Sequence, residues 1–398
     1  MSGTETLGEA PPAGGPPPAL PGAGTWTLSR AGIATVARLE LRQRVRSTRW
    51  IIVLALWGLV LIGLAALIHH AVFAGTGSSV VTEGTDGWDP TGRAGAQMYG
   101  WVVVLVLVLG SLVAPALSAT SINGDRSAGV LATLQATLLS PAEIALGKLL
   151  AAWVTALALL AVASPALLWA VLSGGTPAGR LVVTVALLAV VLLLECAIGL
   201  GWSAVTARTA SSAVLTYLSV AFLGLGLPML FGLLLSVAQR SETVTERVML
   251  PVPNAAAPAE GQAPPLHCVS TTTTETVTHY EWIAWLLVPN PLVVIADASP
   301  PPRYRGGMAY DDVLTGLRSG VRTLRLGPAP RDSCYEVDAT GTPRFAEDDG
   351  RSAERERLGA VWPYGLATEL AIGAAFTVIT VRRLRAPVRT LARGTRVA

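Results

Sequence analysis

Residues 121–148, SINGDRSAGVLATLQATLLSPAEIALGK, place a polar, helix-prone segment between two long apolar runs. Three leucines recur in it at helical spacing: Leu131, Leu134 and Leu138. This spacing predicts a short amphipathic helix over residues 121–139, the elbow, which would lie parallel to a membrane with Asp125 and Arg126 on its other faces. Such a helix is well placed to be pushed by a partner protein.

The apolar run after the elbow begins with a helix-start signal. Ser140 is a typical N-cap residue, Pro141 suits the first helical position, and Glu143 stands where it completes a capping box. The elbow and the following helix are therefore joined directly. Gly147 allows close packing at the base of that helix, and we expect Lys148 to extend its ammonium group to the inner lipid headgroups.

The composition is that of a membrane protein. Of the 398 residues, 52% are hydrophobic and only 14% are charged, so the chain has more apolar surface than a soluble domain can bury. The net charge of +3 is too small and too dispersed to indicate nucleic-acid binding. The sequence contains no G-x-x-x-x-G-K-[ST] motif, so it does not bind ATP by that route, and we expect no cofactor on this chain.

Six apolar runs are long enough, at about 20 residues each, to cross a hydrocarbon core of roughly 30 Å as helices. They are approximately Ile51–Ala74, Met98–Ala119, Leu149–Leu172, Leu181–Val205, Val214–Val237 and Val361–Val381. The predicted fold is therefore an all-α polytopic membrane protein. Helices one to five would lie in residues 50–238 and the sixth in residues 361–381, with the elbow between the second and the third.

Arginines flank the first and the last of these runs. They are Arg38, Arg42, Arg44, Arg46 and Arg49 on one side, and Arg382, Arg383, Arg385, Arg389 and Arg393 on the other. Because such residues mark the cytoplasmic side, both termini are predicted to be cytoplasmic, which requires an even number of spans. Residues 1–24 indicate a disordered tail, and residues 382–398 form a basic one. Residues 25–49 predict an amphipathic helix that either lies in the membrane interface or is solvated and only sets the topology.

The segment 239–360 is predicted to be a large extracytoplasmic insert before the last helix. Within it, residues 282–298 are apolar but interrupted by two prolines, which favours a re-entrant or interfacial segment over a seventh span. The insert would either bind a ligand or cover the exit of a transport path. Cys268 and Cys334 both lie in it, and we expect them to form a disulfide in an oxidising outer milieu.

Two carboxylates lie within the apolar runs, Glu195 in the fourth and Glu369 in the sixth. A charged group in the bilayer core costs about 2.5–3.5 kcal/mol even on lenient scales, so each should face the bundle interior or a wet cavity. They would either line a substrate path or tune a gate, or each would be protonated or bonded to a neighbouring helix as a structural contact. The four histidines show no metal-ligand spacing, and no catalytic arrangement emerges from the sequence.

The elbow and its flanks resemble a known family. The matching residues are Ile122-Asn123-Gly124-Asp125-Arg126, Gly129-Val130-Leu131, Thr137, Leu139-Ser140-Pro141, Glu143-Ile144 and Gly147-Lys148. They are similar to the signature of type-2 exporter permeases of the ATP-binding-cassette (ABC) transporters. The six-span plan and Asn290-Pro291-Leu292 fit the same family.

The resemblance implies a permease subunit in the cell membrane that uses ATPase motion for alternating access, and most family members export. ATP and Mg would be bound by a separate ABC ATPase subunit, and a homodimer or a heterodimer with a second permease would supply the two membrane halves. The residues implied in ATPase coupling are Asp125, Arg126, Gly129, Leu131, Leu134, Ser140 and Glu143. A membrane-embedded enzyme and a non-transporting membrane sensor are the alternatives, and the sequence identifies no substrate.

Overall fold

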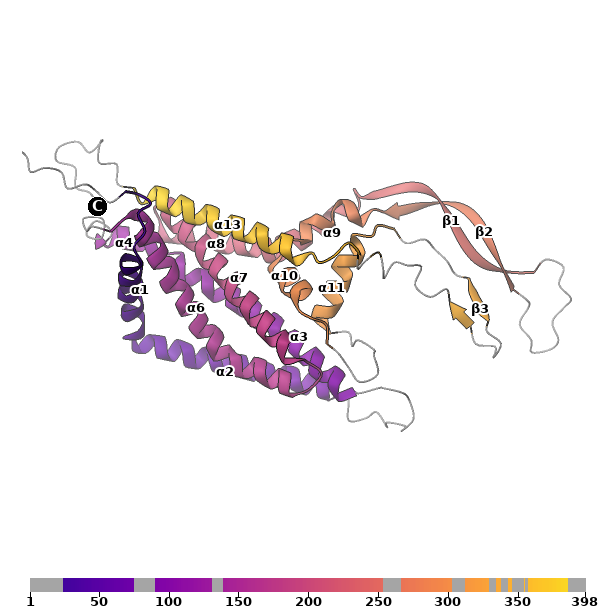
Figure 1. The fold of residues 1–398 in the computed structure, drawn as a ribbon, viewed down its shortest axis with the longest axis horizontal. Coiled ribbons are helices and arrows are strands. Elements are labelled where there is room, and N and C mark those ends of the chain that lie inside the picture. Colours follow the sequence, from indigo (N-terminus) through magenta and orange to yellow (C-terminus); the bar gives the residue numbers. More distant parts are fainter. Residues whose placement is uncertain are drawn as a thin grey trace, which may run out of the picture.

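The computed structural model describes residues 24–74, 90–130, 139–252, 266–302, 312–328, 334–337, 343–345, 354 and 357–385. In this part of the chain, six helices are long and apolar enough to cross a membrane. They lie side by side in one elongated bundle (Figure 1). The predicted polytopic helical fold with six spans is therefore confirmed. Strands occur only in the segments between the fifth and the sixth span of the described residues.

The membrane-length helices match the predicted runs, with starts up to eight residues earlier, as at Pro141 rather than Leu149. They are α2 (Thr48–Phe73), α3 (Pro90–Ser118), α6 (Pro141–Leu172), α7 (Ala178–Val205), the continuous α8 (Thr209–Ala221), η2 (Phe222–Gly226) and α9 (Leu227–Leu234), and α13 (Trp362–Arg383). The stretch η2 is π-helical, so the hydrogen-bond pattern of the fifth span changes near its middle.

The helix α7 lies at the centre of the bundle. It packs against α3, α6, α8 and α13, and more than half of its apolar stretch is buried, whereas most of α2 is exposed. Glycines allow the closest approach of α13 to α7. A methyl group at Gly201 would strike the ring of Phe376, and one at Gly373 would lie 2.6 Å from Cδ2 of Leu194. Small residues therefore set the contact between these two helices.

The helix α1 (Arg30–Val45) crosses one end of the bundle, where α4 (Ser121–Ser127) and the C-terminal end of α13 also lie (Figure 1). Its residues Val36 and Ala37 are buried, and α1 packs on α6. A methyl group at Gly147 of α6 would lie 2.5 Å from Cβ of Val36. Gly147 therefore permits close packing at the base of α6, and α1 is the neighbour that requires it.

The opposite end of the bundle carries the segments between the fifth and sixth spans (Figure 1). The strands there are β1 (Gln239–Pro251), β2 (Leu266–Thr278), β3 (Tyr335–Val337) and β4 (Pro343–Phe345). The first two form a long antiparallel hairpin that extends away from the helices, and the last two form a short one. A disulfide joins Cys268 in β2 to Cys334 directly before β3, with Cα atoms 5.8 Å apart.

Residues 282–298 form no long helix. The chain folds there into η3 (Tyr280–Trp282), η4 (Ala284–Leu287) and α10 (Pro291–Ala298). The side-chain oxygen of Asn290 caps α10. A helix of eight residues is about 12 Å long, so none of these pieces can cross a membrane alone. Instead, α10 packs against α7 and α13.

Two buried acids hold α10 and α11 (Val313–Leu324) on the spans. Asp312, the N-cap of α11, binds the Arg180 guanidinium of α7 with N–O distances of 2.5 and 3.0 Å. Asp297 of α10 accepts from the first two backbone N–H groups at the start of α13, at 2.6 and 2.8 Å. A bidentate arginine pair and a capped helix end fix orientation as well as distance. The outer segments are therefore joined firmly to α7 and α13.

Candidate functional site

The first helix of the elbow, α4 (Ser121–Ser127), ends earlier than the sequence predicts. The helix α4 ends at Ser127, and Gly129 follows with φ +73° and donates its N–H to the carbonyl of Arg126 at 3.2 Å. A glycine in the left-handed region ends helices because other residues are strained there. The expectation of one continuous helix over residues 121–139 is therefore wrong at Gly129. Leu131 and Leu134 lie outside the described residues.

The start of α4 is capped by a residue of α7. The hydroxyl of Ser203 accepts from the backbone N–H groups of Ile122 and Asn123 at 2.9 and 3.2 Å, whereas the N-cap residue Thr120 makes no side-chain cap. The Asn123 amide in turn donates to the hydroxyl of Thr206 at 3.4 Å. These groups would otherwise be buried without partners. The helix α4 is therefore bonded to the end of α7 through both backbone and side chain.

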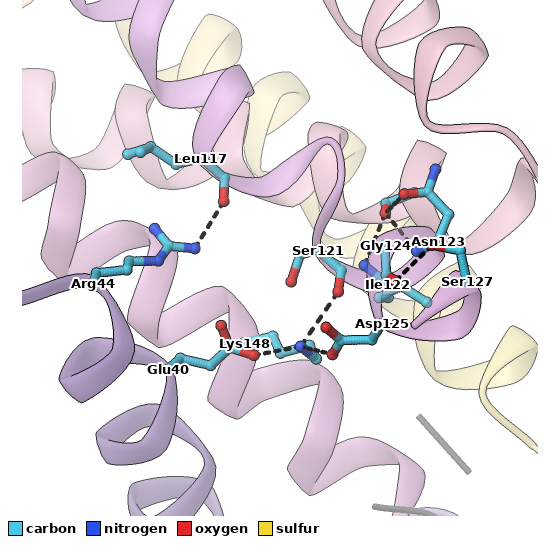
Figure 2. Close-up of polar contacts among 11 residues, drawn as sticks. Glu40, Arg44, Leu117, Ser121, Ile122, Asn123, Gly124, Asp125, Ser127 and Lys148 are labelled. Atoms are coloured by element: carbon cyan, nitrogen blue, oxygen red, sulfur yellow. Dashed lines mark hydrogen bonds and ion pairs between the residues drawn. The ribbon is translucent and has the colours of Figure 1, made fainter. Parts of the chain in front are cut away.

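Lys148 joins α4 to α1 and α6. Its ammonium group pairs with the carboxylate of Glu40 in α1, lies 2.5 Å from Oδ2 of Asp125 in α4, and donates to the carbonyl of Ser121 at 3.3 Å (Figure 2). Lys148 is only 2% exposed. The expectation that Lys148 reaches the lipid headgroups is therefore wrong, because two carboxylates and α1 enclose its ammonium group. Asp125 points inward to this cation.

Ser140 and Glu143 form the predicted capping box at the start of α6. Ser140 Oγ accepts from the N–H of Glu143 at 3.1 Å, and Glu143 Oε2 accepts from the N–H of Ser140 at 2.8 Å. The second carboxylate oxygen of Glu143 accepts from the N–H of Ser29, at the start of α1, at 2.8 Å. Ser140 also donates to the carbonyl of Thr27 at 2.5 Å. One carboxylate therefore caps α6 and holds the beginning of α1.

Arg44 provides a further bond between α1 and the spans. Its guanidinium donates to the carbonyl of Leu117 near the end of α3 at 2.9 Å (Figure 2). It also donates to the hydroxyl of Thr155 in α6 at 3.2 Å. Desolvation by burial lowers the pKa of Arg44, and the nearby Glu40 opposes this change. The sequence indicated only a topological role for this arginine. Arg44 lies between the exposed Arg42 and Arg46 in the sequence, so its position gave no indication that its guanidinium would be bonded inside the protein.

These contacts make the elbow a junction of four helices. A displacement of α4 would act on α7 through Ser203, and on α6 and α1 through Lys148. The turn after α4, residues 127–129, is exposed and lies at the same end of the molecule. Among the described residues, no group of three or more His, Cys, Asp or Glu side chains could hold a metal ion. The arrangement can therefore transmit a displacement, because an exposed turn continues a helix that is held by the ion pairs of the buried Lys148.

Glu195 and Glu369 lie together, away from the elbow. Both are 4% exposed and line one small cavity between α7 and α13. The hydroxyl of Ser111 in α3 donates to Oε1 of Glu195 at 2.5 Å. The sequence placed each carboxylate inside a span but contained no signal that the two share a cavity.

The comparison with known proteins agrees with this architecture. Residues 34–260 match the model of a family described as ABC-2 family transporter protein. This range covers more than half of the chain, including most of α1, the elbow and the first five spans. No curated protein sequence matches the chain.

Proposed function

Since the chain belongs to the family of ABC-2 transporter proteins, we propose that it couples the movement of a separate ABC ATPase to the export of a substrate. The chain is a multi-pass membrane subunit of a transporter. The observation that carries the coupling proposal is the junction at α4. The helix α4, which ends in this exposed turn, is bonded through Ser203 to α7 and through Lys148 to α6 and α1.

In the proposed mechanism, the ATPase binds the exposed turn formed by residues 127–129 and moves α4 when it binds and hydrolyses ATP. Because buried ion pairs in low-dielectric surroundings resist separation, α1 and α6 follow α4 through Lys148. The cap by Ser203 passes the same motion to α7, at the centre of the bundle. The bundle then alternates between inward-facing and outward-facing states. ATP and Mg belong to the ATPase subunit in this proposal.

We further propose that the end of the bundle with α1 and α4 faces the cytoplasm of the cell, together with both termini. Arginines gather at this end, in α1 and at Arg382 and Arg383 at the end of α13, as the positive-inside rule requires. The hairpin of β1 and β2 then lies outside the cell membrane. Two membrane halves, from a homodimer or from a heterodimer with a second permease, complete the transporter.

Site-directed crosslinking tests whether the ATPase binds the elbow. A cysteine-reactive photocrosslinker is attached to Ala128→Cys in the exposed turn and, as a control, to Thr245→Cys in β1, after removal of the native cysteines. With the co-encoded ATPase, position 128 should capture the ATPase and position 245 should not. Capture at neither position, or equally at both, would show that the elbow is not the ATPase contact.

Transport in vesicles tests whether the junction carries the motion. Ser203→Ala removes the acceptor for two backbone N–H groups of α4, so it should lower transport while the ATPase remains bound. Ser164→Ala is the matched control, because that exposed hydroxyl bonds only to the carbonyl of Ala161 in its own helix. Normal ATP-dependent transport by Ser203→Ala would exclude this route of coupling.

A further inference from the structure

A small cavity lies within the membrane-spanning part of the bundle, bounded by α7, α8, η2 and α13 and also lined by Pro291 of α10. Its volume is about 20 Å³, enough for one group of the size of a water molecule. The lining residues are Val191, Leu194, Glu195, Ile198, Val220, Leu223, Pro291, Glu369 and Ile372. The cavity is thus apolar except for two carboxylates.

Three carboxylate oxygens of the two acids that line this cavity have no hydrogen-bond partner among the described residues. They are Oε2 of Glu195 and both oxygens of Glu369. Only Oε1 of Glu195 is bonded, to the hydroxyl of Ser111. Buried polar groups are almost always bonded, and an unpaired carboxylate in apolar surroundings is costly. The three oxygens can therefore accept hydrogen bonds from a donor that enters the cavity.

The wall of the cavity is also irregular at this point. Leu223 lies in the π-helical stretch η2, and π-helical turns inside α-helices occur frequently at functional sites. The side-chain amide of Asn290 donates to the carbonyls of Leu223 and Gly224 at 3.0 and 2.8 Å. Pro291 follows directly and lines the cavity. The segment before α10 therefore holds the irregular wall in place and connects it to the outer end of the bundle.

We propose that this cavity binds the ammonium group of an amphiphilic primary amine, which would be the substrate class of the export proposed above. A primary ammonium has three N–H donors and one positive charge, and the cavity has three unbonded oxygens on two carboxylates. The apolar part of the molecule would lie along the partly exposed side chains of Val220 and Ile372, which also line the cavity.

A metal ion fits this cavity less well than an ammonium group. Calcium takes six to eight oxygen ligands, and magnesium needs a near-ideal octahedral shell. Apart from Glu195 and Glu369, the residues that line the cavity have apolar side chains. An ammonium group needs only the hydrogen bonds that the two carboxylates offer. The apolar lining then stabilises the attached hydrocarbon instead of a hydration shell.

Binding to the full-length permease in phosphatidylcholine nanodiscs tests the proposal without the ATPase. Dodecylamine is compared by calorimetry with dodecan-1-ol, which lacks the charge, and with dodecyltrimethylammonium, which lacks the N–H groups; empty nanodiscs provide the background. Dodecylamine should bind about tenfold more tightly than either, since charge-assisted hydrogen bonds discriminate by at least that factor. Equal binding of the amine and the alcohol would overturn the proposal, and equal binding of the quaternary amine would exclude a primary ammonium.

Variants locate the site. Glu369→Gln and Glu195→Gln should each weaken dodecylamine binding about tenfold and leave dodecan-1-ol unaffected, whereas the exposed Glu354→Gln should change neither. Unchanged amine binding by Glu369→Gln and Glu195→Gln would overturn the assignment of this cavity. A melting temperature close to that of the wild type shows that each variant is folded.

A lipid headgroup and a soluble amine share the same chemistry, and nanodiscs that contain phosphatidylethanolamine distinguish them. Competition with dodecylamine assigns the site to the lipid, and its absence assigns the site to a soluble amphiphile. If Glu195→Gln or Glu369→Gln loses amine binding while position 128 still captures the ATPase, the result supports the amine site and leaves the proposed coupling intact. Amine binding without ATPase capture would instead reject the proposed coupling and keep the substrate class.

Discussion

Lys148 of α6 and Asp125 of α4 form an ion pair, with Nζ and Oδ2 2.5 Å apart, at the point where the chain leaves the second span and enters the third. The lysine side chain is 1% exposed and the aspartate side chain 28% exposed. The pair therefore joins a buried position on a long helix to a short helix at the surface. Glu40 of α1 completes the group from the other side.

Removal of this cation should destabilise the protein. Lys148→Met leaves two carboxylates facing each other, and breaking a buried pair costs about 3–5 kcal/mol, here at the lower end because the acids are partly exposed. Adding Asp125→Asn and Glu40→Gln should restore part of the loss. Thermal unfolding of the single and triple variants measures the loss of stability and its recovery. Arg126→Gln, in the same helix, is the control, and an equal loss there would contradict the role of the pair.

Gly129 should tolerate asparagine better than alanine. Its φ of +73° lies in the left-handed region, where alanine costs about 1–2 kcal/mol and asparagine is accepted more readily. Gly129→Pro should be the most damaging, because proline fixes φ near −65° and removes the N–H that bonds to Arg126. At equal expression, transport should be highest for Gly129→Asn, lower for Gly129→Ala and lowest for Gly129→Pro. A proline variant as active as the asparagine variant would show that this turn is not required.

Labelling in intact cells should distinguish the two ends of the bundle. After removal of the native cysteines, Thr245→Cys in β1 should react with an impermeant maleimide from outside, because it is exposed on the hairpin. Ala128→Cys, in the turn after α4, should react only after the membrane is permeabilised. External labelling at position 128 would reverse the proposed topology.

The disulfide between Cys268 and Cys334 should stabilise the outer segments. The two residues are 66 positions apart, and closing a loop of that length contributes about 4 kcal/mol in the chain-entropy model. Without reductant, intact-mass analysis after alkylation should show neither cysteine modified. The Cys268→Ser/Cys334→Ser variant should lower the unfolding temperature of the outer segments. Two alkylated thiols in the untreated protein would disprove the bridge.

The contact around His279, at the base of the hairpin, should weaken at high pH. The pKa of His279 is raised above 6.5, mainly because Nδ1 bonds to the carboxylate of Glu281 at 2.7 Å. Desolvation lowers the pKa, and the contact of Nε2 with Glu242 at 3.1 Å raises it further. The contribution to stability is therefore complete below pH 6.5 and is lost as the pH rises through the raised pKa. In an NMR titration, Glu281→Gln should move the midpoint of His279 toward 6.5. A wild-type midpoint at or below 6.5 would contradict this contact.

The sequence by itself determined the features that depend on neighbours along the chain. Run length and apolar composition were sufficient to identify six spans, because a helix in lipid must satisfy its own backbone and cover about 30 Å. The start of α6 was equally local, since Ser140 and Glu143 cap a helix three residues apart. The prolines in residues 282–298 also predicted that this segment would form no long helix, because proline interrupts a helix.

Only the tertiary structure decided the partners of the polar residues. Ser203 reaches Ile122 across 81 positions of the chain, and Lys148 reaches Glu40 across 108. Glu195 and Glu369 meet in one cavity although they lie in different spans. Such pairs depend on the rotation and height of each helix in the bundle, and an all-round apolar helix carries no periodic pattern from which its rotation could be read. Close packing of small residues sets that rotation, and it is a property of two helices together.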